Sequence, residues 1–219
     1  MDKNKYITIA LDGAAGSGKS TTAKALCTKF KYIHVDTGLH YRSLCLYFLN
    51  KNISPDNVIN FLQNEEINLC SFIEQNSAFL LLNQERFTVD QLRNEQMNQQ
   101  VSYYARIPEV RERLLKYQRG LCQYGQQNGF SGIIMDGRDI GSVVLPDADL
   151  KFFLHADLHI RQSRRSIDGE MDSISGRDKL DSTRKIAPLA CPKQAVSINT
   201  GVLSIDEVVN LISTKILDI

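Results

Sequence analysis

The chain has 219 residues, 42% of them apolar, and a formal net charge of +1. Its length suits one domain, or one core with small inserted lobes. The small net charge gives no global field that points to nucleic acid or to a membrane surface. No apolar run approaches the roughly 18 residues of a membrane span, and no targeting segment is evident, so we expect a soluble, cytoplasmic protein.

The five cysteines are scattered, odd in number and without a C-x-x-C pair. They are Cys27, Cys45, Cys70, Cys122 and Cys191. This pattern argues against a disulfide framework or a zinc site. Buried free thiols in a reducing compartment are the simpler interpretation.

The N-terminal part has the pattern strand, glycine-rich loop, helix. Residues 7–11 form a short apolar run that predicts a strand, and residues 18–30 have helical spacing. Between them, Gly13 to Ser20 matches G-x-x-x-x-G-K-[ST], the phosphate-binding loop of P-loop proteins. A second strand at 32–36 and a helix at 37–49 follow.

The chemistry of such a loop depends on its position in the chain. Glycines let consecutive backbone N–H groups turn inward on a phosphate, and the following helix N-terminus adds partial positive charge. Lys19 can reach the β- and γ-phosphates, and the Ser20 hydroxyl can ligate Mg²⁺. The alternative is a chance glycine-rich turn, which the flanking strand and helix disfavour.

The middle of the chain interrupts the alternation of strands and helices. Residues 67–72 and 78–82 predict two strands joined by a polar turn, the hairpin of a small inserted lobe at roughly residues 64–90. Helices are predicted at about 91–104 and 108–127, and Pro108 suits a first helical turn.

The alternation resumes in the last third. Strands are predicted at 131–136, 150–155 and 196–199, and a closing helix at 204–216 starts with a capping box of Ser204 and Glu207. Together with the first two strands they predict an α/β fold with a five-stranded parallel sheet between two layers of helices.

An irregular stretch from Asp168 to Arg177 is rich in Gly, Asp and Ser. It is either a solvated surface loop or a mobile lid, and the basic residues on both flanks favour the lid.

The third core strand ends in acidic and basic residues. Asp136 follows the apolar strand, where a P-loop protein usually holds Mg²⁺. Ligands of open α/β sheets bind at the strand carboxyl ends, so Asp136 and the loop should meet there. Arg138 could stabilise charge that develops on a transferred phosphoryl group. The alternative is a surface turn with an internal Asp–Arg pair.

Basic residues recur near the irregular stretch. Arg161 and Arg165 are four residues apart and share a helix face, and Asp181 stands between Arg177 and Arg184 at helical spacing. They are either ion pairs on a solvated helix or an arginine clamp on phosphates. The P-loop favours the clamp.

The four histidines show no nucleophile or metal-ligand spacing, and we interpret them as structural. They are His34, His40, His155 and His159.

Taken together, these motifs resemble the bacterial cytidylate kinases over nearly the whole chain. The resemblance rests on motifs in the same order along the chain: 9–13, Asp36-Thr37-Gly38 with Tyr41-Arg42, Pro108-x-Val110-Arg111, 136–141, 144–148, Ala187-Pro188-Leu189 and Leu203-Ser204. It implies one P-loop kinase domain over residues 1–219, with a nucleoside monophosphate (NMP) binding insert at about 64–107 and a lid at about 166–186. The chain departs from the family pattern at Ala14, Leu180 and Asn199.

The resemblance also implies roles for individual residues. The ATP site would comprise Gly13, Ala14, Ala15, Gly16, Ser17, Gly18, Lys19, Ser20, Thr21 and Arg161. The CMP site would comprise Thr37, Arg42, Ser102, Arg111, Arg138, Asp139, Arg177, Asp181 and Arg184, with Ser102, Arg111 and Asp139 reading the cytosine. Lys19, Arg138, Arg165 and Arg177 would act in catalysis, and Ser20 and Asp136 would hold the metal.

The reaction implied is phosphoryl transfer from ATP to CMP or dCMP, with Mg²⁺ as the cofactor. The expected partners are these small molecules alone, with no nucleic acid or membrane, and the expected state is a monomer. Two alternatives remain open: a kinase for another acceptor such as UMP or AMP, and a nucleotide-binding module without transferase activity.

Overall fold

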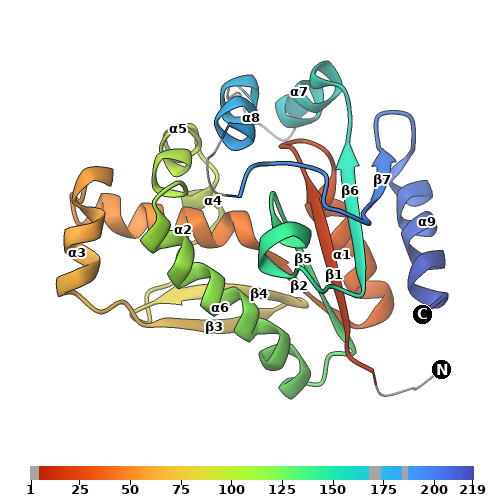
Figure 1. Cartoon of the computed structure of the whole chain (residues 1–219), viewed down its shortest axis with the longest axis horizontal. Coiled ribbons are helices and arrows are strands. Elements are labelled where there is room, and N and C mark those ends of the chain that lie inside the picture. Colours follow the sequence, from red (N-terminus) through yellow and green to blue (C-terminus); the bar gives the residue numbers. More distant parts are fainter. Residues whose placement is uncertain (1–4, 168–173, 184–186) are drawn as a thin grey trace.

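The computed structural model describes residues 5–167, 174–183 and 187–219. Its central sheet has the strand order β3-β4-β2-β5-β1-β6-β7. The five strands expected from the alternation are parallel neighbours in this sheet (Figure 1): β1 (Ile7–Gly13), β2 (Tyr32–Asp36), β5 (Gly132–Gly137), β6 (Leu150–His155) and β7 (Val196–Asn199). The α/β class is therefore confirmed.

The hairpin, expected in a small inserted lobe, extends the central sheet, which was expected to have five strands. β3 (Leu69–Glu74) and β4 (Ser77–Leu82) are antiparallel, and β4 joins β2 in parallel, so the described sheet has seven strands. The turn residues Gln75 and Asn76 both have positive φ, at 47° and 61°, as a tight two-residue hairpin requires. The hairpin covers the edge of β2, whose N–H and C=O groups would otherwise lack partners.

The helices follow the expected order with two differences. The helix expected at 91–104 is two helices, because Asn94 caps a new one: its side chain accepts the N–H of Met97 at 2.8 Å. A helix at Val58–Asn64 was not expected. The described helices are α1 (Lys19–Phe30), α2 (Thr37–Asn50), α3 (Val58–Asn64), α4 (Val89–Leu92), α5 (Glu95–Tyr104), α6 (Pro108–Gln127), α7 (Leu158–Ile167), α8 (Ile174–Ser182) and α9 (Ile205–Leu217). Short 3-10 and π-helical turns, η1 (Pro55–Asn57) and η2 (Ile140–Val144), complete the list.

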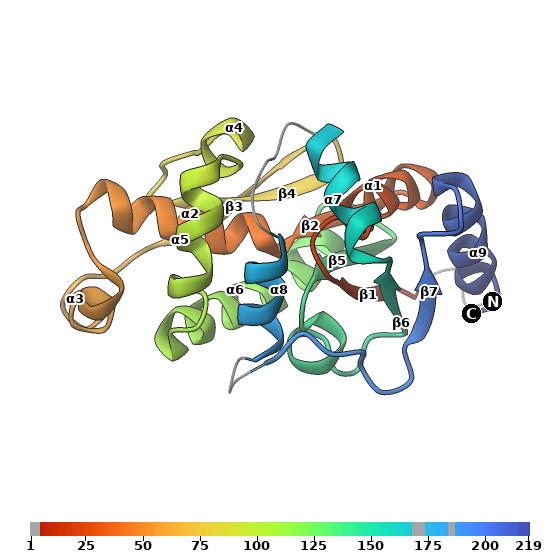
Figure 2. The same ribbon diagram turned by 90° about the horizontal axis from the view of Figure 1, so that it is seen from above.

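The two faces of the parallel strands are covered by different helices. Ile9 and Leu11 of β1 pack with residues of α1 and α9, whereas Ala10 between them packs with residues of α6 and η2. This is the alternation that a strand buried on both faces must have. Figure 2 shows the sheet from above, between its two helical layers.

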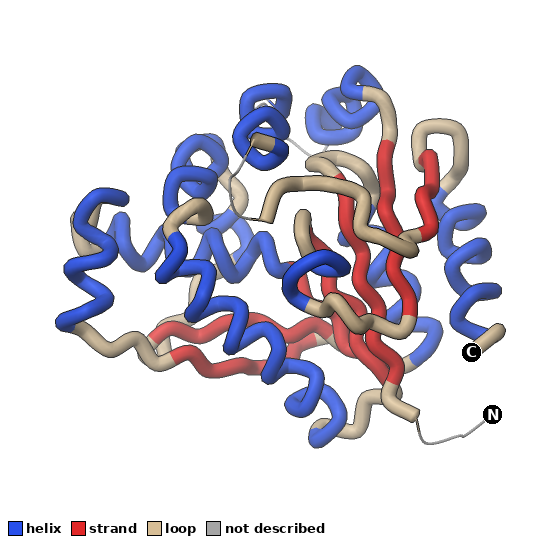
Figure 3. Tube along the Cα trace, in the orientation of Figure 1, coloured by secondary structure: helices blue, strands red, loops and turns tan. Residues whose placement is uncertain are grey.

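A third apolar cluster lies away from the parallel strands. It joins α2, α3, α5 and the first turns of α6 to the hairpin, with Phe48, Tyr104 and Leu114 fully buried in it. Figure 3 shows the two parts side by side, the parallel strands towards α9 and the hairpin with its helices towards α3.

The carboxyl ends of the parallel strands lie at one edge of the sheet, and α7 and α8 lie beyond that edge (Figure 1). Helix α2 begins directly after β2, and α1 and α7 follow β1 and β6 after short loops. The fold therefore brings several helix N-termini to one place. None of the described helices combines the length and apolar character needed to cross a bilayer.

Candidate nucleotide-binding and active site

A pocket of about 560 Å³ lies at this edge. Its walls come from the glycine loop, the first turns of α2, the segment after β5, the insert helix α5, and α7, α8 and the start of α9. The volume is in the range of pockets that hold small molecules. Segments far apart in the sequence thus converge on one cavity.

The glycine loop adopts the conformation its glycines permit. Gly16 and Gly18 have φ of 72° and 87°, in the left-handed region that favours glycine. Gly18 precedes the first residue of α1, so the N-terminus of that helix faces the pocket. The predicted phosphate-binding loop is therefore formed, with its residues Ala15 to Thr21 lining the pocket.

Lys19 is folded over this loop. Its ammonium group donates to the carbonyl of Ala14 at 2.7 Å and to Ser17 Oγ at 3.4 Å. Burial, with a further contribution from the nearby Arg138 guanidinium, lowers the pKa of Lys19 to about 7. A phosphate group entering the loop would bring the negative charge that favours the protonated amine.

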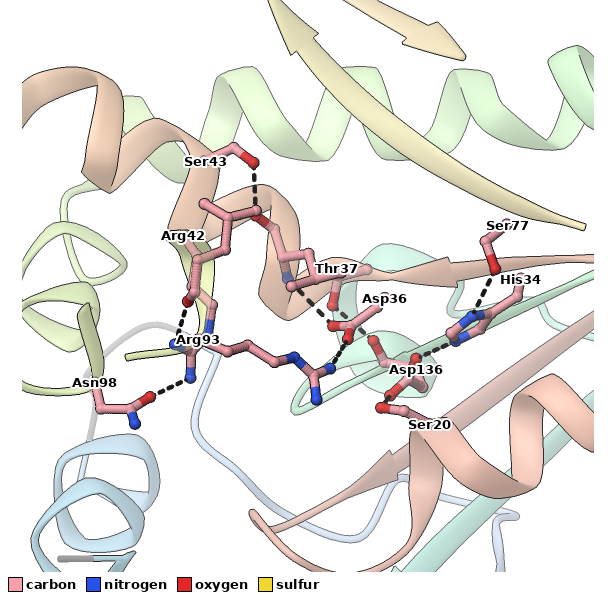
Figure 4. A network of polar contacts seen from close by, with 12 residues as sticks. Ser20, His34, Asp36, Thr37, Arg42, Ser43, Ser77, Arg93, Asn98 and Asp136 are labelled. Atoms are coloured by element: carbon pink, nitrogen blue, oxygen red, sulfur yellow. Dashed lines mark hydrogen bonds and ion pairs between the residues drawn. The ribbon is translucent and has the colours of Figure 1, made fainter. Parts of the chain in front are cut away.

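Asp136 forms the centre of a polar network (Figure 4). Its Oδ2 accepts from the Ser20 hydroxyl at 2.7 Å, and its Oδ1 lies 2.7 Å from Nε2 of His34. The Thr37 hydroxyl donates to its main-chain carbonyl at 2.8 Å. Ser20 and Asp136, the two predicted metal ligands, are therefore brought together.

Arg138 connects the loop to α8. Its Nη1 donates to the carbonyl of Gly13 at 2.6 Å, and its Nε donates to Asp181 Oδ2 at 2.8 Å. Burial would lower the pKa of Arg138, but the Asp181 carboxylate outweighs it and raises that pKa. The guanidinium is thus held charged at the pocket wall.

The predicted base-reading residues also lie together. Arg111 forms a buried ion pair with Asp139 and donates to the carbonyl of Ala105 at 3.2 Å. Its guanidinium carbon lies 5.6 Å from the centre of the Tyr41 ring. Ser102 is buried and lines the same pocket as Asp139.

Arg42 extends from α2 towards the insert. It donates to the carbonyl of Leu92 at 2.7 Å and to Asn98 Oδ1 at 2.6 Å (Figure 4). Arg93 of the insert pairs with Asp36 at 2.8 Å. The insert is therefore connected to the edge of the sheet through these two arginines.

Arg161 of α7 connects the glycine loop to α8. It donates to the carbonyl of Ala15 at 3.0 Å and pairs with Asp178 of α8 at 2.5 Å. Arg165, on the same helix, lines the pocket. Arg177 lies in α8, but its side chain and all of Arg184 are outside the described residues, so their predicted roles stay predictions.

Sequence reasoning missed Asp12. This fully buried carboxylate accepts the N–H groups of Ile140 and Gly141, both at 2.7 Å. It therefore ties the end of β1 to the segment directly after Arg138 and Asp139. An acidic residue at the end of an otherwise apolar strand was the available signal.

His34, Asn98 and Asp178 were also missed as site residues. Each contacts a predicted site residue rather than the pocket itself, and such contacts depend on the tertiary fold. For His34, a polar residue between Ile33 and Val35 in an apolar strand was the one visible signal.

The fold and the pocket together define a P-loop protein of the kinase type, with a pocket at its glycine loop. The model of the family described as cytidylate kinase matches residues 9–218. The chain belongs to the cytidylate kinase family, and it is a nucleoside monophosphate kinase that acts on small-molecule nucleotides.

Curated relatives agree with this assignment, and a solved structure shares the fold. A cytidylate kinase of Caldicellulosiruptor saccharolyticus is 40% identical over 93% of this chain and 92% of its own length. One of Exiguobacterium sibiricum is 39% identical over 94% of both chains. The crystal structure of TT1252 from Thermus thermophilus, 14% identical, has a TM-score of 0.50 and covers 96% of this chain and 98% of its own, a similarity of fold alone.

Proposed function

We propose that the chain transfers the γ-phosphoryl group of ATP to CMP or dCMP, giving ADP and CDP or dCDP. The observation that carries the proposal is one pocket lined both by the glycine loop and by Ser102 and Asp139, the latter paired with Arg111. The glycine loop suits a triphosphate, and the second group of residues suits a base.

The base end has the polarity that cytosine requires. Cytosine offers an amino donor beside ring acceptors, whereas uracil offers a carbonyl acceptor at the position of that amino group. The Asp139 carboxylate can only accept hydrogen bonds and the Arg111 guanidinium can only donate them. Asp139 therefore favours the amino group of cytosine and repels the corresponding carbonyl of uracil.

The phosphate end aligns and neutralises the reacting groups. Lys19, Arg138 and the helix N-terminus of α1 would hold the donor phosphates, and Arg42 and Arg138 the acceptor monophosphate. The acceptor phosphate is already ionised, so the chain needs no general base. Phosphoryl transfer of this kind depends on position and on charge neutralisation.

The oxygen groups of Ser20 and Asp136 fit Mg²⁺. Hydroxyl and carboxylate oxygens are its preferred protein ligands, and Mg²⁺ usually takes only one or two from the protein. These two residues would hold the ion, and when bound it would neutralise charge on the β- and γ-phosphates.

The lid helices would complete the site. Arg161 and Arg165 on α7 would approach ATP, while Asp181, with Arg177 and Arg184, would face the acceptor. Closure of these segments over bound nucleotides would exclude water and limit wasteful hydrolysis of ATP.

The test is ADP release, coupled to a dehydrogenase assay, with ATP, Mg²⁺ and each of CMP, dCMP, UMP and AMP. We expect strong turnover with CMP and dCMP and weak turnover with UMP and AMP. Turnover with UMP or AMP alone would contradict the assignment of the base end. Nucleotide binding without turnover on any acceptor would instead indicate a binding module.

A further inference from the structure

We propose that His34 is a positioning residue for the metal carboxylate: it holds Oδ1 of Asp136 so that Oδ2 remains directed at Ser20. This inference rests on the proposed metal site and assigns a role to a residue outside it. The contact is 2.7 Å long, and both side chains are almost completely buried. Figure 4 shows His34 on the side of Asp136 away from Ser20.

The direction of the hydrogen bond follows from the groups present. An ionised carboxylate can only accept, so Nε2 of His34 must carry the proton. In the neutral ring, Nδ1 is then an acceptor, and the Ser77 hydroxyl lies 3.4 Å from it. The contact at Nε2 thus fits an imidazole that donates to Asp136.

The two oxygens of Asp136 are divided between two partners. Oδ1 belongs to His34 and Oδ2 to Ser20, so rotation of the carboxylate would break both contacts. The main-chain carbonyl of Asp136 is held separately by Thr37. His34 and Ser20 therefore together restrain the rotation of the carboxylate, which the main-chain contact does not fix.

His34 lies between β5 and the hairpin in the sheet, and its backbone pairs with both. Its backbone N–H donates to the carbonyl of Asn76 at 2.7 Å, and its register partner in β4 is Ser77. Neighbouring Ile33 and Val35 pack on the opposite face with α6, so His34 lies on the face of α1 and Asp136. The hairpin therefore supports the metal carboxylate through one imidazole.

A purely structural role would not require this geometry. An apolar side chain at position 34 would fill the space between strand and helix without the cost of burying an imidazole. Partners that orient a ligand in this way typically change metal affinity by about 10- to 100-fold when they are removed. If His34 positions Asp136, replacing His34 should therefore weaken metal binding.

The test compares His34→Gln with His34→Asn. The glutamine amide nitrogen can take the place of Nε2 and donate to Asp136, whereas the shorter asparagine amide corresponds to Nδ1 and does not reach. Mn²⁺ binding to each ADP-loaded variant is titrated by electron paramagnetic resonance, and kcat and KM for CMP are measured at varied Mg²⁺.

We expect His34→Asn to weaken Mn²⁺ binding by about 10-fold and to raise the Mg²⁺ requirement of kcat, with KM for CMP unchanged. His34→Gln should restore most of the Mn²⁺ affinity. Ser71→Ala is the matched control, because it removes a hairpin hydrogen bond, to Tyr117 at 2.7 Å, without touching His34. It should leave Mn²⁺ binding unchanged.

An unchanged Mn²⁺ affinity in a folded His34→Asn variant would overturn the proposal. Asp136→Asn separates this failure from failure of the metal site itself. If Asp136→Asn weakens Mn²⁺ binding and His34→Asn does not, the positioning role alone is wrong. If neither variant weakens Mn²⁺ binding, the assignment of Asp136 as a metal ligand is also wrong.

Discussion

Arg138 and Lys19 bring positive charge to the glycine loop from two directions. Lys19 lies over the loop, and Arg138 donates to the carbonyl of Gly13 at its start. We expect Lys19→Ala or Arg138→Ala to lower kcat by at least ~10²-fold, because each removes charge that stabilises the moving phosphoryl group. Steady-state kinetics with CMP checks this. The control is Lys24→Ala, because Lys24 is an exposed residue of the same helix α1. Near-normal turnover in Lys19→Ala or Arg138→Ala would refute the role assigned to the residue replaced.

Asp139 provides a test of base selection. Asp139→Asn replaces an acceptor-only group with one that can also donate, so it should lower kcat/KM for CMP by about 10-fold and narrow the preference for CMP over UMP. The KM for ATP should stay unchanged, since Asp139 pairs with Arg111 and is not among the residues assigned to ATP. An unaltered CMP-to-UMP ratio would argue against base reading by Asp139.

Asp12 makes a pH-dependent contribution to stability. Burial raises its pKa from 3.8 to about 6, although the two N–H donors oppose that shift. A raised pKa means that the folded chain holds the proton more tightly, so this contribution is full below about pH 4 and is lost as pH rises through about 6.

The corresponding comparison is with Asp12→Asn. Relative to that variant, the free energy of unfolding of the unaltered protein should fall by about 1 kcal/mol between pH 5 and pH 7. Urea unfolding followed by circular dichroism at both pH values measures the difference. A pH-independent difference would mean that Asp12 does not titrate in this range.

At the level of elements, the capping box of α9 formed as expected. The Ser204 hydroxyl accepts the N–H of Glu207 at 3.3 Å, and the Glu207 carboxylate accepts the N–H of Ser204 at 2.7 Å. Ser204→Ala should lower the free energy of unfolding by about 1 kcal/mol. Thermal and urea unfolding check this, with Thr214→Ala at the other end of the helix as the control. Equal stability of Ser204→Ala and the unaltered protein would contradict the role of the cap.

The elements that could be predicted from the sequence are those that short local sequence patterns determine. The parallel strands follow from short β-rich runs, α6 begins at Pro108 as expected, and the loop follows from its glycines. The hairpin could be predicted as a hairpin but not as part of the sheet. Its only register pair with β2 is His34 and Ser77, and pairing across 43 residues depends on tertiary packing.

Within the site, the predictable residues were those whose chemistry belongs to a local motif, such as Lys19, Ser20 and Asp136. Asp12 and Asn98 were not predictable in the same way. Their partners, the N–H groups after β5 and the Arg42 guanidinium, lie far away in the sequence.

At the scale of the whole molecule, the pocket lies between two packed parts. One part is the parallel sheet with α1 and α9, and the other is the apolar cluster around Phe48, which joins α2, α3, α5 and α6 to the hairpin. Nucleotide bound between them should stabilise the entire fold by linkage.

CMP at 100 times its Kd should raise the free energy of unfolding by about 2.7 kcal/mol, which corresponds to a Tm increase of roughly 5–10 °C for a chain of this size. Differential scanning calorimetry measures the shift, with AMP at the same concentration as the control. A shift with ADP but none with CMP would argue against the assigned acceptor end.

Light scattering on the same samples tests the expectation that the protein is a monomer.

The contact between Gly16 and α7 has a genetic consequence. A methyl group at position 16 would come within 2.7 Å of the main-chain oxygen of Arg161. The obstacle is backbone, so no replacement of the Arg161 side chain can relieve it. Intragenic suppressors of Gly16→Ala should therefore be changes that shift the whole start of α7. A side chain at position 16 of the glycine loop would then be tolerated only together with a change that moves α7.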